Sequence, residues 1–329
     1  MNKILLNIVS SMFISITIYF IIATVLIIIN GKPKENMSKQ NKLVFDELVI
    51  DYTEIPPLDS YLCRDGIELN YYYYQAQTNK VLIMLHGSGW HSKYFLSLAK
   101  YISSENIAHV YTPDLRGHGI SPIKRGDINY INQLEDDLAD FLSIVREKHP
   151  NSTLIIGGHS SGSGLAIRFA GSKYGKYADA YMLLSPFLKY NAPTMKLNSG
   201  GWASAHIPRI IGLSMLNNVG ISWFNYLKVI DFNMSEEYRD GTETLSYSYR
   251  LNTGFAPRNY KKDLSAIKQE VLVVVGKSDE SFIAEAFLPE ISKYKKDVNV
   301  ILLDGVTHMG IVMGKEVRPI IKKWITDLN

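Results

Sequence analysis

Cysteine is nearly absent from this sequence, in which Cys63 is the only one among 329 residues. A single thiol excludes an internal disulfide framework and any metal site built from several cysteines. Charge of one sign is not concentrated anywhere either. The 35 basic and 32 acidic residues give a net charge of +3, and no basic block marks a nucleic-acid-binding surface. We therefore expect no nucleic-acid partner.

Charged side chains are missing from one long stretch, Ile4 to Gly31. About 20 apolar residues in a helix cross the core of a bilayer, so residues 4–29 are predicted to contact the lipid bilayer as a single-pass N-terminal membrane anchor. A cleaved signal peptide has a shorter apolar core, roughly 7–15 residues, and a small-residue cleavage site after it. This run is longer, and the adjoining INGKPKENMSK offers no such site. Cleavage or a buried helix is the alternative.

The side of the membrane on which the rest of the chain lies is left open. Four lysines come after the apolar run, at positions 32, 34, 39 and 42, and Lys3 alone precedes it. Counting basic residues places the large domain in the cytoplasm. The very short segment before Lys3, however, resembles signal anchors that keep the N-terminus inside and export the remainder of the chain.

Short apolar runs alternate with segments of helical period along most of the chain. The predicted strands are 47–52, 68–74, 81–85, 109–113, 153–157, 180–184, 271–275 and 298–303, and the predicted helices are 92–104, 130–148, 161–172, 282–294 and 310–327. Runs such as VLIML and VLVVV are typical of central strands covered on both faces. The alternation predicts an α/β fold with a doubly wound, mostly parallel sheet, entered by an antiparallel hairpin at the YYYY run, 71–74.

The predicted organisation has four parts. Residues 1–31 form the transmembrane anchor and residues 32–45 a polar tether, while residues 46–186 and 264–329 together form the α/β core. The remaining segment, 187–263, is irregular and aromatic, and its glycines, prolines and asparagines interrupt any long helix. We interpret it as an insertion of short helices over the carboxyl edge of the sheet.

The stretch TLIIGGHSSGSGLA, residues 153–166, contains three serines near a strand end. A nucleophile elbow has the pattern G-x-S-x-G, because bulky residues two positions either side of the serine would collide with the neighbouring strand and helix. Only Ser160 has glycines at both places, Gly158 and Gly162. The apolar strand before the motif and the helical spacing after it favour an elbow over an ordinary turn of small residues. Ser160 is therefore the predicted nucleophile.

A serine hydroxyl needs a base that is held by a third group. In folds with this elbow the acid and then the histidine come after the serine along the chain. Asp279 lies just beyond the strand VLVVV, in GKSDE, and His308 lies just beyond the strand NVILLD, in GVTHMG. Both strand ends belong to the edge where open α/β sheets bind ligands. Asp279 is the predicted acid, with Asp304 and Glu280 as alternatives, and His308 is the predicted base.

Backbone donors for an oxyanion are expected at two places. One is the N–H of Ser161, directly after the nucleophile, and the other lies in the HGSGW loop after the strand VLIML, where we expect the N–H of Ser88. Gly87 lets this loop curl, and His86 is predicted to orient it by hydrogen bonding; an ordinary surface histidine is the alternative.

Together these motifs resemble the α/β-hydrolase superfamily, and within it the serine aminopeptidase and monoacylglycerol lipase-like (lysophospholipase) branch. The resemblance runs from about residue 61 to 328 and rests on HGSG, PDLRGHGIS, GHSSG, GKSDE and TH, in that order. It implies a triad of Ser160, Asp279 and His308, a cap over an acyl pocket at 187–263, and a supporting role for Asp114 and Arg116 of the DLRGHG loop. The Ser161-Gly162-Ser163 run departs from the family, which commonly has a bulky residue and then two glycines after the nucleophile.

The expected function is hydrolysis of carboxylic esters, lipid or acylglycerol-type, by a membrane-anchored serine hydrolase that forms an acyl-enzyme. Peptide hydrolysis by the same triad, acyl transfer to an acceptor other than water, and a non-catalytic binding protein on the same fold are the alternatives. We expect neither a metal nor another cofactor, since the glycine cluster at 157–164 lacks the G-x-G-x-x-G register of a dinucleotide site.

Overall fold

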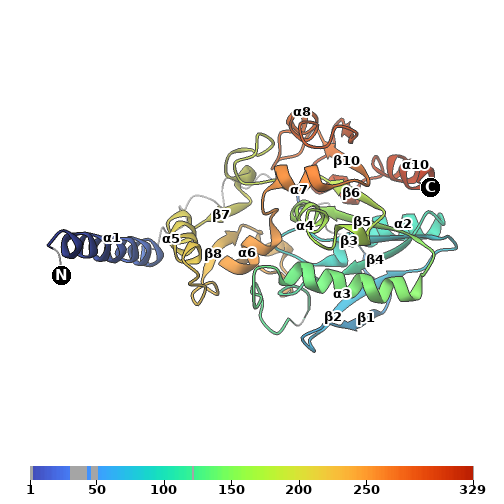
Figure 1. The fold of residues 1–329 in the computed structure, drawn as a ribbon. Helices are drawn as coiled ribbons and strands as arrows, with labels where there is room; N and C mark the ends of the chain where they lie inside the picture. Colours follow the sequence, from blue (N-terminus) through green and yellow to red (C-terminus); the bar gives the residue numbers. More distant parts are fainter. Residues whose placement is uncertain (1–2, 30–42, 46–50, 121, 329) are drawn as a thin grey trace.

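The central feature of the fold is an eight-stranded sheet. The computed structural model describes residues 3–29, 43–45, 51–120 and 122–328. The strands of the sheet are β1 (Leu58–Leu62), β2 (Glu68–Tyr74), β3 (Lys80–Leu85), β4 (His109–Pro113), β5 (Thr153–His159), β6 (Ala180–Leu184), β10 (Glu270–Gly276) and β11 (Asn299–Leu303). Their order across the sheet is β1-β2-β4-β3-β5-β6-β10-β11. In Figure 1 the sheet extends from β1 and β2 near the bottom to β10 near the top.

Strand directions confirm the predicted mostly parallel sheet. All neighbours from β4 to β11 are parallel, whereas β1 and β2 form an antiparallel pair and β2 lies antiparallel to β4. The β1–β2 pair is the hairpin expected at the YYYY run. Most of the strand predicted at 47–52 lies outside the described residues, and Asp51 and Tyr52 are not in a strand.

Helices cover both faces of the sheet, as the continuous apolar runs require. The α-helices of this part are α2 (Leu96–Ser104), α3 (Gln133–Lys148), α4 (Ser161–Ala170), α7 (Tyr260–Ala266), α8 (Phe287–Ile291), α9 (Gly310–Met313) and α10 (Arg318–Asp327), with the 3₁₀ turns η2 (Ser92–Phe95), η3 (Gly175–Tyr177) and η6 (Ala284–Ala286). Alternation along β3 divides the core: Ile83 packs in the cluster that contains residues of α3 and α4, and Leu82 packs in the cluster that contains residues of α2 and α10.

Two predicted helices are shorter or broken in the structure. The segment 282–294 contains only η6 and α8, and the segment 310–327 is divided into α9 and α10. The division results from the residues between them, because Gly314 leaves the helical backbone at the end of α9 and Pro319 favours the first turn of a new helix.

The chain between β6 and β10 contains a second, smaller sheet, which corrects the expectation of helices alone. Its strands are β7 (Ala203–Ala205), β8 (Lys228–Phe232) and β9 (Ser246–Ser248), all antiparallel, and its helices are η4 (Leu197–Gly201), α5 (Ile207–Asn218), η5 (Glu236–Tyr238) and α6 (Tyr249–Phe255). Strands of three residues are too short to show an alternating pattern in a sequence.

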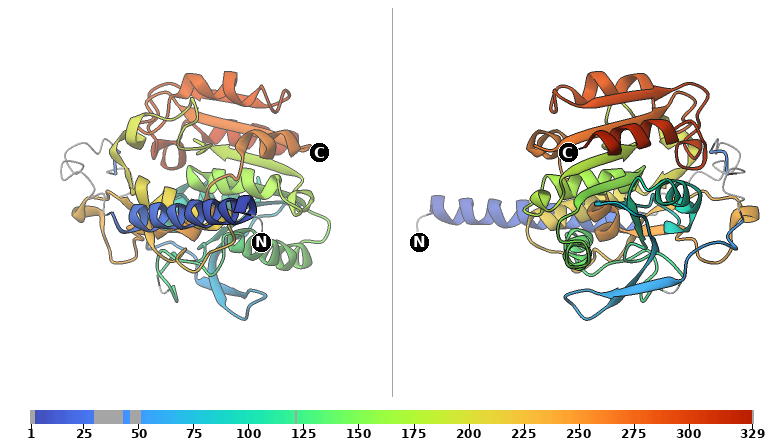
Figure 2. Two further views of the ribbon diagram at one scale, coloured as in Figure 1. Left: turned by 60° about the vertical axis from the view of Figure 1, so that its left-hand side comes forward. Right: turned by 90° about the vertical axis from the view of Figure 1, so that its right-hand side faces the viewer.

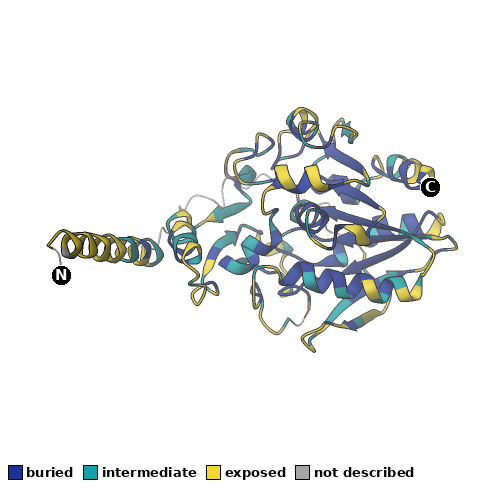
Figure 3. Cartoon of the chain, viewed as in Figure 1, coloured by how far each residue is buried: buried dark blue, intermediate teal, exposed yellow. Residues whose placement is uncertain are grey.

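The N-terminal helix α1 (Lys3–Ile28) projects from the rest of the molecule (Figures 1 and 2). Most of its side chains are exposed, as the yellow ribbon in Figure 3 shows, although they are almost all apolar. It is the one helix of the described residues that is long and apolar enough to cross a membrane, and a signal sequence would pass the same test.

Candidate active site

Ser160 occupies the sharp turn between β5 and α4. Its backbone has φ 54° and ψ −118°, a region that non-glycine residues rarely adopt. The turn is joined to the neighbouring strand β6, since the Ser160 N–H donates to the carbonyl of Leu184 at 2.9 Å. A strained, tightly held serine that remains partly exposed at the end of a central strand has the geometry of a nucleophile elbow.

The two glycines of the motif are required by close backbone contacts. A methyl group on Gly158 would come within 2.4 Å of the carbonyl carbon of Gly162, and one on Gly162 would come within 2.0 Å of the carbonyl oxygen of Leu85. Neither contact involves a side chain that could rotate away. The spacing that singles out Ser160 in the sequence therefore has a steric cause in the structure.

Replacing Gly162 with alanine is expected to lower the free energy of unfolding by about 2 kcal/mol or more, because the new methyl group overlaps the Leu85 carbonyl. Urea unfolding followed by circular dichroism measures the change. Gly66→Ala is the matched control: Gly66 has φ +78° and open space around it, so only the backbone penalty of about 1 kcal/mol is expected there. Equal losses for the two variants would contradict the steric explanation.

Asp279 and His308 meet at the carboxyl ends of β10 and β11. The Asp279 carboxylate accepts a hydrogen bond from His308 Nδ1 at 2.8 Å, and its other oxygen accepts the backbone N–H groups of Ser281 and Phe282 at 2.9 Å each. The two alternative acids have other partners. Glu280 accepts the backbone N–H of His308 at 2.8 Å, while Asp304 pairs with Lys277 on the surface.

Burial and charge act in opposite directions on this pair. Burial raises the pKa of Asp279, but the charge and hydrogen bond of His308, together with the hydrogen bond from the Ser281 N–H, lower it by more, so the net pKa lies below its ordinary value. Burial lowers the pKa of His308, but the Asp279 carboxylate raises it by more, so the net pKa lies above its ordinary value. Asp279 therefore stays ionised and stabilises the protonated imidazole, which is what a base-orienting acid must do.

His159, the residue before Ser160, connects the elbow to the loop of His308. Its Nε2 donates to the carbonyl of His308 at 3.0 Å. No hydrogen bond joins the Ser160 hydroxyl to the His308 ring among the described residues. Such a bond often forms only when substrate is bound. The structure thus brings the three predicted residues to one edge of the sheet and joins two of them directly.

The HGSG loop lies against Ser160, and the partners of its three central amides differ. A methyl group on Gly87 would be 3.4 Å from Ser160 Cβ. The Gly87 N–H donates to Tyr94 at 2.7 Å and the Gly89 N–H donates to Tyr247 at 2.8 Å. Among the hydrogen bonds of the described residues, none uses the Ser88 N–H. It is therefore free to bind a substrate oxygen.

The second predicted donor, the N–H of Ser161, is the first amide of α4. The first amides of a helix have no intrahelical acceptor. None of the hydrogen bonds within the described part of the chain uses this N–H. The positive end of the helix dipole adds a favourable field for negative charge at this place.

His86 is buried and joins two loops, so the alternative of a surface histidine is excluded. The Leu115 N–H donates to Nε2 at 3.0 Å, so the proton of the neutral ring sits on Nδ1, which donates to the carbonyl of Gly87 at 2.8 Å. Burial lowers the pKa of His86 well below its ordinary value. The neutral imidazole thus fixes the HGSG loop to the DLRGHG loop.

Asp114 and Arg116 are bound within the scaffold. The Asp114 carboxylate accepts two hydrogen bonds from Ser92, one from its backbone N–H at 2.9 Å and one from its hydroxyl at 2.6 Å. Arg116 donates to both carboxylate oxygens of Asp137 in α3 at 2.7 Å each. These contacts fix the DLRGHG loop between η2 and α3, which is the kind of support that the family resemblance implies.

Two tyrosine–histidine chains near the site were not predicted from the sequence. Tyr94 accepts from Gly87 and donates to His159 Nδ1 at 3.1 Å. Tyr247, from β9 of the insertion, accepts from Gly89 and donates to His118 Nε2 at 2.6 Å. Burial lowers the pKa of His159 to about 3 and that of His118 to about 4, so both rings are neutral acceptors at pH 7. Tyr247 is distant in the chain from its partners and has no sequence signal.

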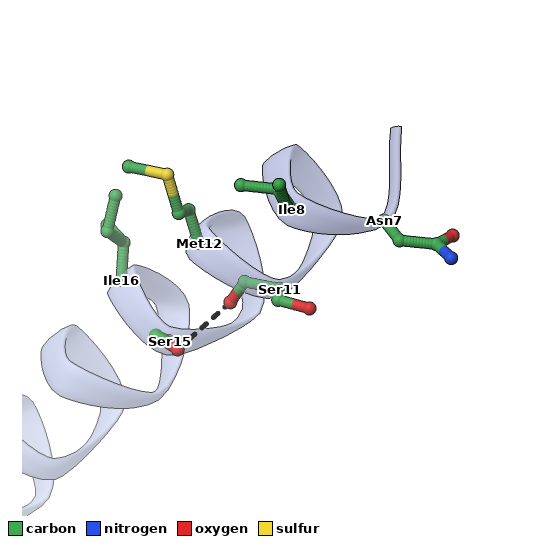
Figure 4. Close-up of a pocket in the computed structure, with 6 residues that line it drawn as sticks. All are labelled: Asn7, Ile8, Ser11, Met12, Ser15 and Ile16. Carbon is green, nitrogen blue, oxygen red and sulfur yellow. Dashed lines mark hydrogen bonds between the residues drawn. The ribbon is translucent and has the colours of Figure 1, made fainter. Parts of the chain in front are cut away.

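Two other features bear on where a ligand could bind. A hollow along α1 is open on the face of a single helix and contains none of the predicted site residues (Figure 4); it is lined by Asn7, Ile8, Ser11, Met12, Ser15 and Ile16. Within the described ranges, no group of three or more histidine, cysteine, aspartate or glutamate side chains is placed to hold a metal ion.

Comparison with known proteins decides the family. The family model described as "Serine aminopeptidase, S33" matches residues 76–311, well over half of the chain. The chain belongs to the serine aminopeptidase S33 family. This result confirms the resemblance predicted from the motifs, and the matched S33 region contains all three residues of the predicted triad.

Curated relatives of this S33 family member are similar over only part of their length. A monoacylglycerol lipase of Mycolicibacterium smegmatis is 27% identical over 123 residues, which cover 37% of this chain and 43% of that protein. The human monoglyceride lipase is 28% identical over 144 residues, 43% of this chain and 46% of that protein. The aligned part thus spans less than half the length of either relative.

Solved structures agree with the S33 assignment at the level of the fold. The monoacylglycerol lipase of Paleococcus ferrophilus has a TM-score of 0.61 at 19% identity, covering 80% of this chain and 100% of that one. A soluble variant of the monoglyceride lipase of Saccharomyces cerevisiae, in complex with a substrate analog, has a TM-score of 0.60 at 17% identity, covering 83% and 96%. These likenesses establish the α/β-hydrolase fold and do not extend to substrates.

Proposed function

We propose that this protein is a membrane-anchored serine hydrolase that cleaves carboxylic esters, of the monoacylglycerol type, through a covalent acyl-enzyme. The observation that carries the proposal is the 2.8 Å bond between Asp279 and His308 at the same sheet edge as the strained Ser160. The similar proteins are named as lipases, which supports an ester as the substrate. The family is described as serine aminopeptidase, which makes peptide hydrolysis the second candidate function.

The proposed mechanism uses side chains and amides of this chain and one water molecule. Ser160 Oγ attacks the ester carbonyl while His308 Nε2 takes its proton, and Asp279 holds the imidazole and stabilises its charge. The N–H groups of Ser88 and Ser161 then bind the oxyanion. His308 returns the proton to the leaving alcohol. In the second half of the reaction a water molecule, deprotonated by His308, attacks the acyl-enzyme carbonyl. The bond to Ser160 Oγ then breaks, the carboxylic acid leaves and His308 returns the proton to Ser160.

Aromatic side chains of the insertion and of the core near His308 support an apolar acyl group. Trp202 lies over the HGSG loop: its indole N–H donates to the Ser88 hydroxyl at 3.2 Å, and its ring would lie 2.6 Å from a methyl group on Gly89. Phe232 stacks on Trp202 with ring centroids 5.3 Å apart, and Phe282 lies 5.3 Å from the His308 ring. Such an aromatic environment favours a hydrocarbon chain over a charged aminoacyl group.

The division of the chain and its location are parts of the same proposal. Residues 46–186 and 264–329 act as the catalytic core, residues 187–263 as the cap, residues 1–31 as the anchor and residues 32–45 as the tether. The length and composition of α1 support the anchor. Most of the tether lies outside the described residues.

Substrate class is tested with the full chain in detergent micelles. p-Nitrophenyl esters of graded length and 1-monoacylglycerols are compared with aminoacyl anilides. We expect kcat/KM for the preferred ester to exceed that for the best anilide at least about tenfold, since the aromatic side chains beside the HGSG loop and His308 favour an apolar acyl chain. Cleavage of anilides alone would replace the esterase with the peptidase. A folded protein that cleaves neither and reacts with no fluorophosphonate probe would contradict both.

A further inference from the structure

Helix α1 is attached to the insertion through α5. The Tyr19 hydroxyl donates to the carbonyl of Met215 at 2.7 Å. Gly212 permits close approach of the two helices, since a methyl group there would come within 2.6 Å of the Ala23 carbonyl oxygen. Ala23 is completely buried by this contact, in contrast to the exposed side chains of the N-terminal half of α1.

The contacts run in opposite directions along the two helices. Going from Tyr19 to Ile27 in α1, the partner in α5 moves from Met215 back to Arg209, whose Nε donates to the Ile27 carbonyl at 3.2 Å. The C-terminal end of α5 therefore lies on the side of the N-terminal half of α1. That half extends away from the body of the molecule beside the insertion (Figure 2).

The turn after α5 carries large exposed side chains. Trp223 is 80% exposed, Phe224 43% and Tyr226 53%, and Val219 at the start of the turn is 51% exposed. The segment 219–226, VGISWFNY, contains no charge. Trp and Tyr are the residues enriched at membrane–water interfaces, and a cluster of exposed aromatic residues is unusual on a surface that faces only water.

Helix length favours contact between this turn and lipid. The part of α1 before the α5 contact, Lys3–Ile18, is about 24 Å long at 1.5 Å per residue. The hydrocarbon core of a bilayer is about 30 Å thick. A helix that spans it must therefore bring the start of the α5 contact, and the turn beside it, into the interfacial layer.

We propose that α1, α5 and the turn 219–226 form one membrane-docking unit, in which the α1–α5 contact holds the insertion on a phospholipid bilayer and the turn's aromatic side chains enter the headgroup region. This inference rests on the proposed membrane anchor. It places the insertion, and with it the approach to Ser160, at the surface from which a lipid ester would come.

The test uses the full chain in phosphatidylcholine vesicles that contain brominated lipid, which quenches nearby tryptophan fluorescence. We expect Trp223→Phe to remove roughly half or more of the lipid-dependent quenching, because Trp223 is the one placed at the interface. The matched control is Trp324→Phe, at a buried residue of α10, which should leave the quenching unchanged.

A second variant tests the contact between the helices. Gly212→Leu should separate α5 from α1, so the protein should remain in the vesicle pellet while Trp223 loses its quenching. Tyr19→Phe removes only the hydrogen bond to Met215 and should give a smaller loss of Trp223 quenching. It provides a test of the same contact if the leucine variant does not fold.

The outcomes separate the two proposals. A wild-type protein that alkaline carbonate strips from the vesicles would contradict the anchor. An anchored protein whose quenching is the same with and without Trp223 would overturn the docking unit while the anchor stands. Cross-linking of two chains through position 223 in the vesicles, with no lipid quenching, would also overturn it, in favour of a second copy of this chain as the partner.

Discussion

Replacing Ser160 with alanine is expected to reduce kcat by about 10⁴- to 10⁶-fold, the loss typical when a triad nucleophile is removed. The residual rate would come from the oxyanion donors and from binding, which the substitution leaves in place. Steady-state ester hydrolysis measures the rate, and labelling with a fluorophosphonate probe reports the nucleophile directly. Circular dichroism must show that the variant is folded.

The neighbouring serine gives a control that differs by one position. Ser161→Ala retains the backbone N–H that is proposed to bind the oxyanion, so activity should stay within about tenfold of the wild type and the probe should still react. Ser163 is less suitable, because its buried hydroxyl donates to the carbonyl of Gly158 at 2.5 Å and its loss would disturb the turn. Equal labelling of wild type and Ser160→Ala would contradict the assignment of Ser160.

The central sheet could be predicted because its strands are apolar and bounded by clear turns. The prediction for 68–74 matches β2 at both ends, and those for 109–113 and 180–184 match β4 and β6. A strand that is buried on both faces has a continuous apolar run, so its own residues are enough to identify it. The insertion gives no such signal. β7 and β9 are held by pairing with β8, and their own three residues, ASA and SYS, carry no period.

The position of the proposed triad residues at one sheet edge could be predicted for a related reason. Ser160, Asp279 and His308 each come after a predictable strand, so chain order and sheet direction bring them to one edge. The tyrosines that hold the HGSG loop could not be found in this way. Tyr94 lies in a 3₁₀ turn and Tyr247 in a short strand of the insertion, and each acts through one hydroxyl across a fold whose packing had to be known first.

Asp279→Asn is expected to lower kcat by about 10⁴-fold. The amide no longer holds His308 in the tautomer that can accept the serine proton, and it does not stabilise the imidazolium that then forms. The same substitution should change the pH dependence. Activity requires neutral His308, so in the wild type log kcat/KM falls as the pH drops through a His308 pKa that the Asp279 carboxylate holds above its ordinary value. Without this carboxylate, burial lowers that pKa, and the acid limb should move to lower pH.

The other two carboxylates complete this test. Asp304→Asn removes the charge of a side chain that is 88% exposed and paired with Lys277 at the surface, so the rate and pH profile of this variant should match the wild type. Glu280→Gln removes a charge that also raises the pKa of His308 and weakens the hydrogen bond to its backbone N–H. A smaller shift of the acid limb in the same direction is expected there. An unchanged limb in Asp279→Asn together with a large shift in Glu280→Gln would instead make Glu280 the partner of His308, because the carboxylate in direct contact with the imidazole has the largest effect on its pKa.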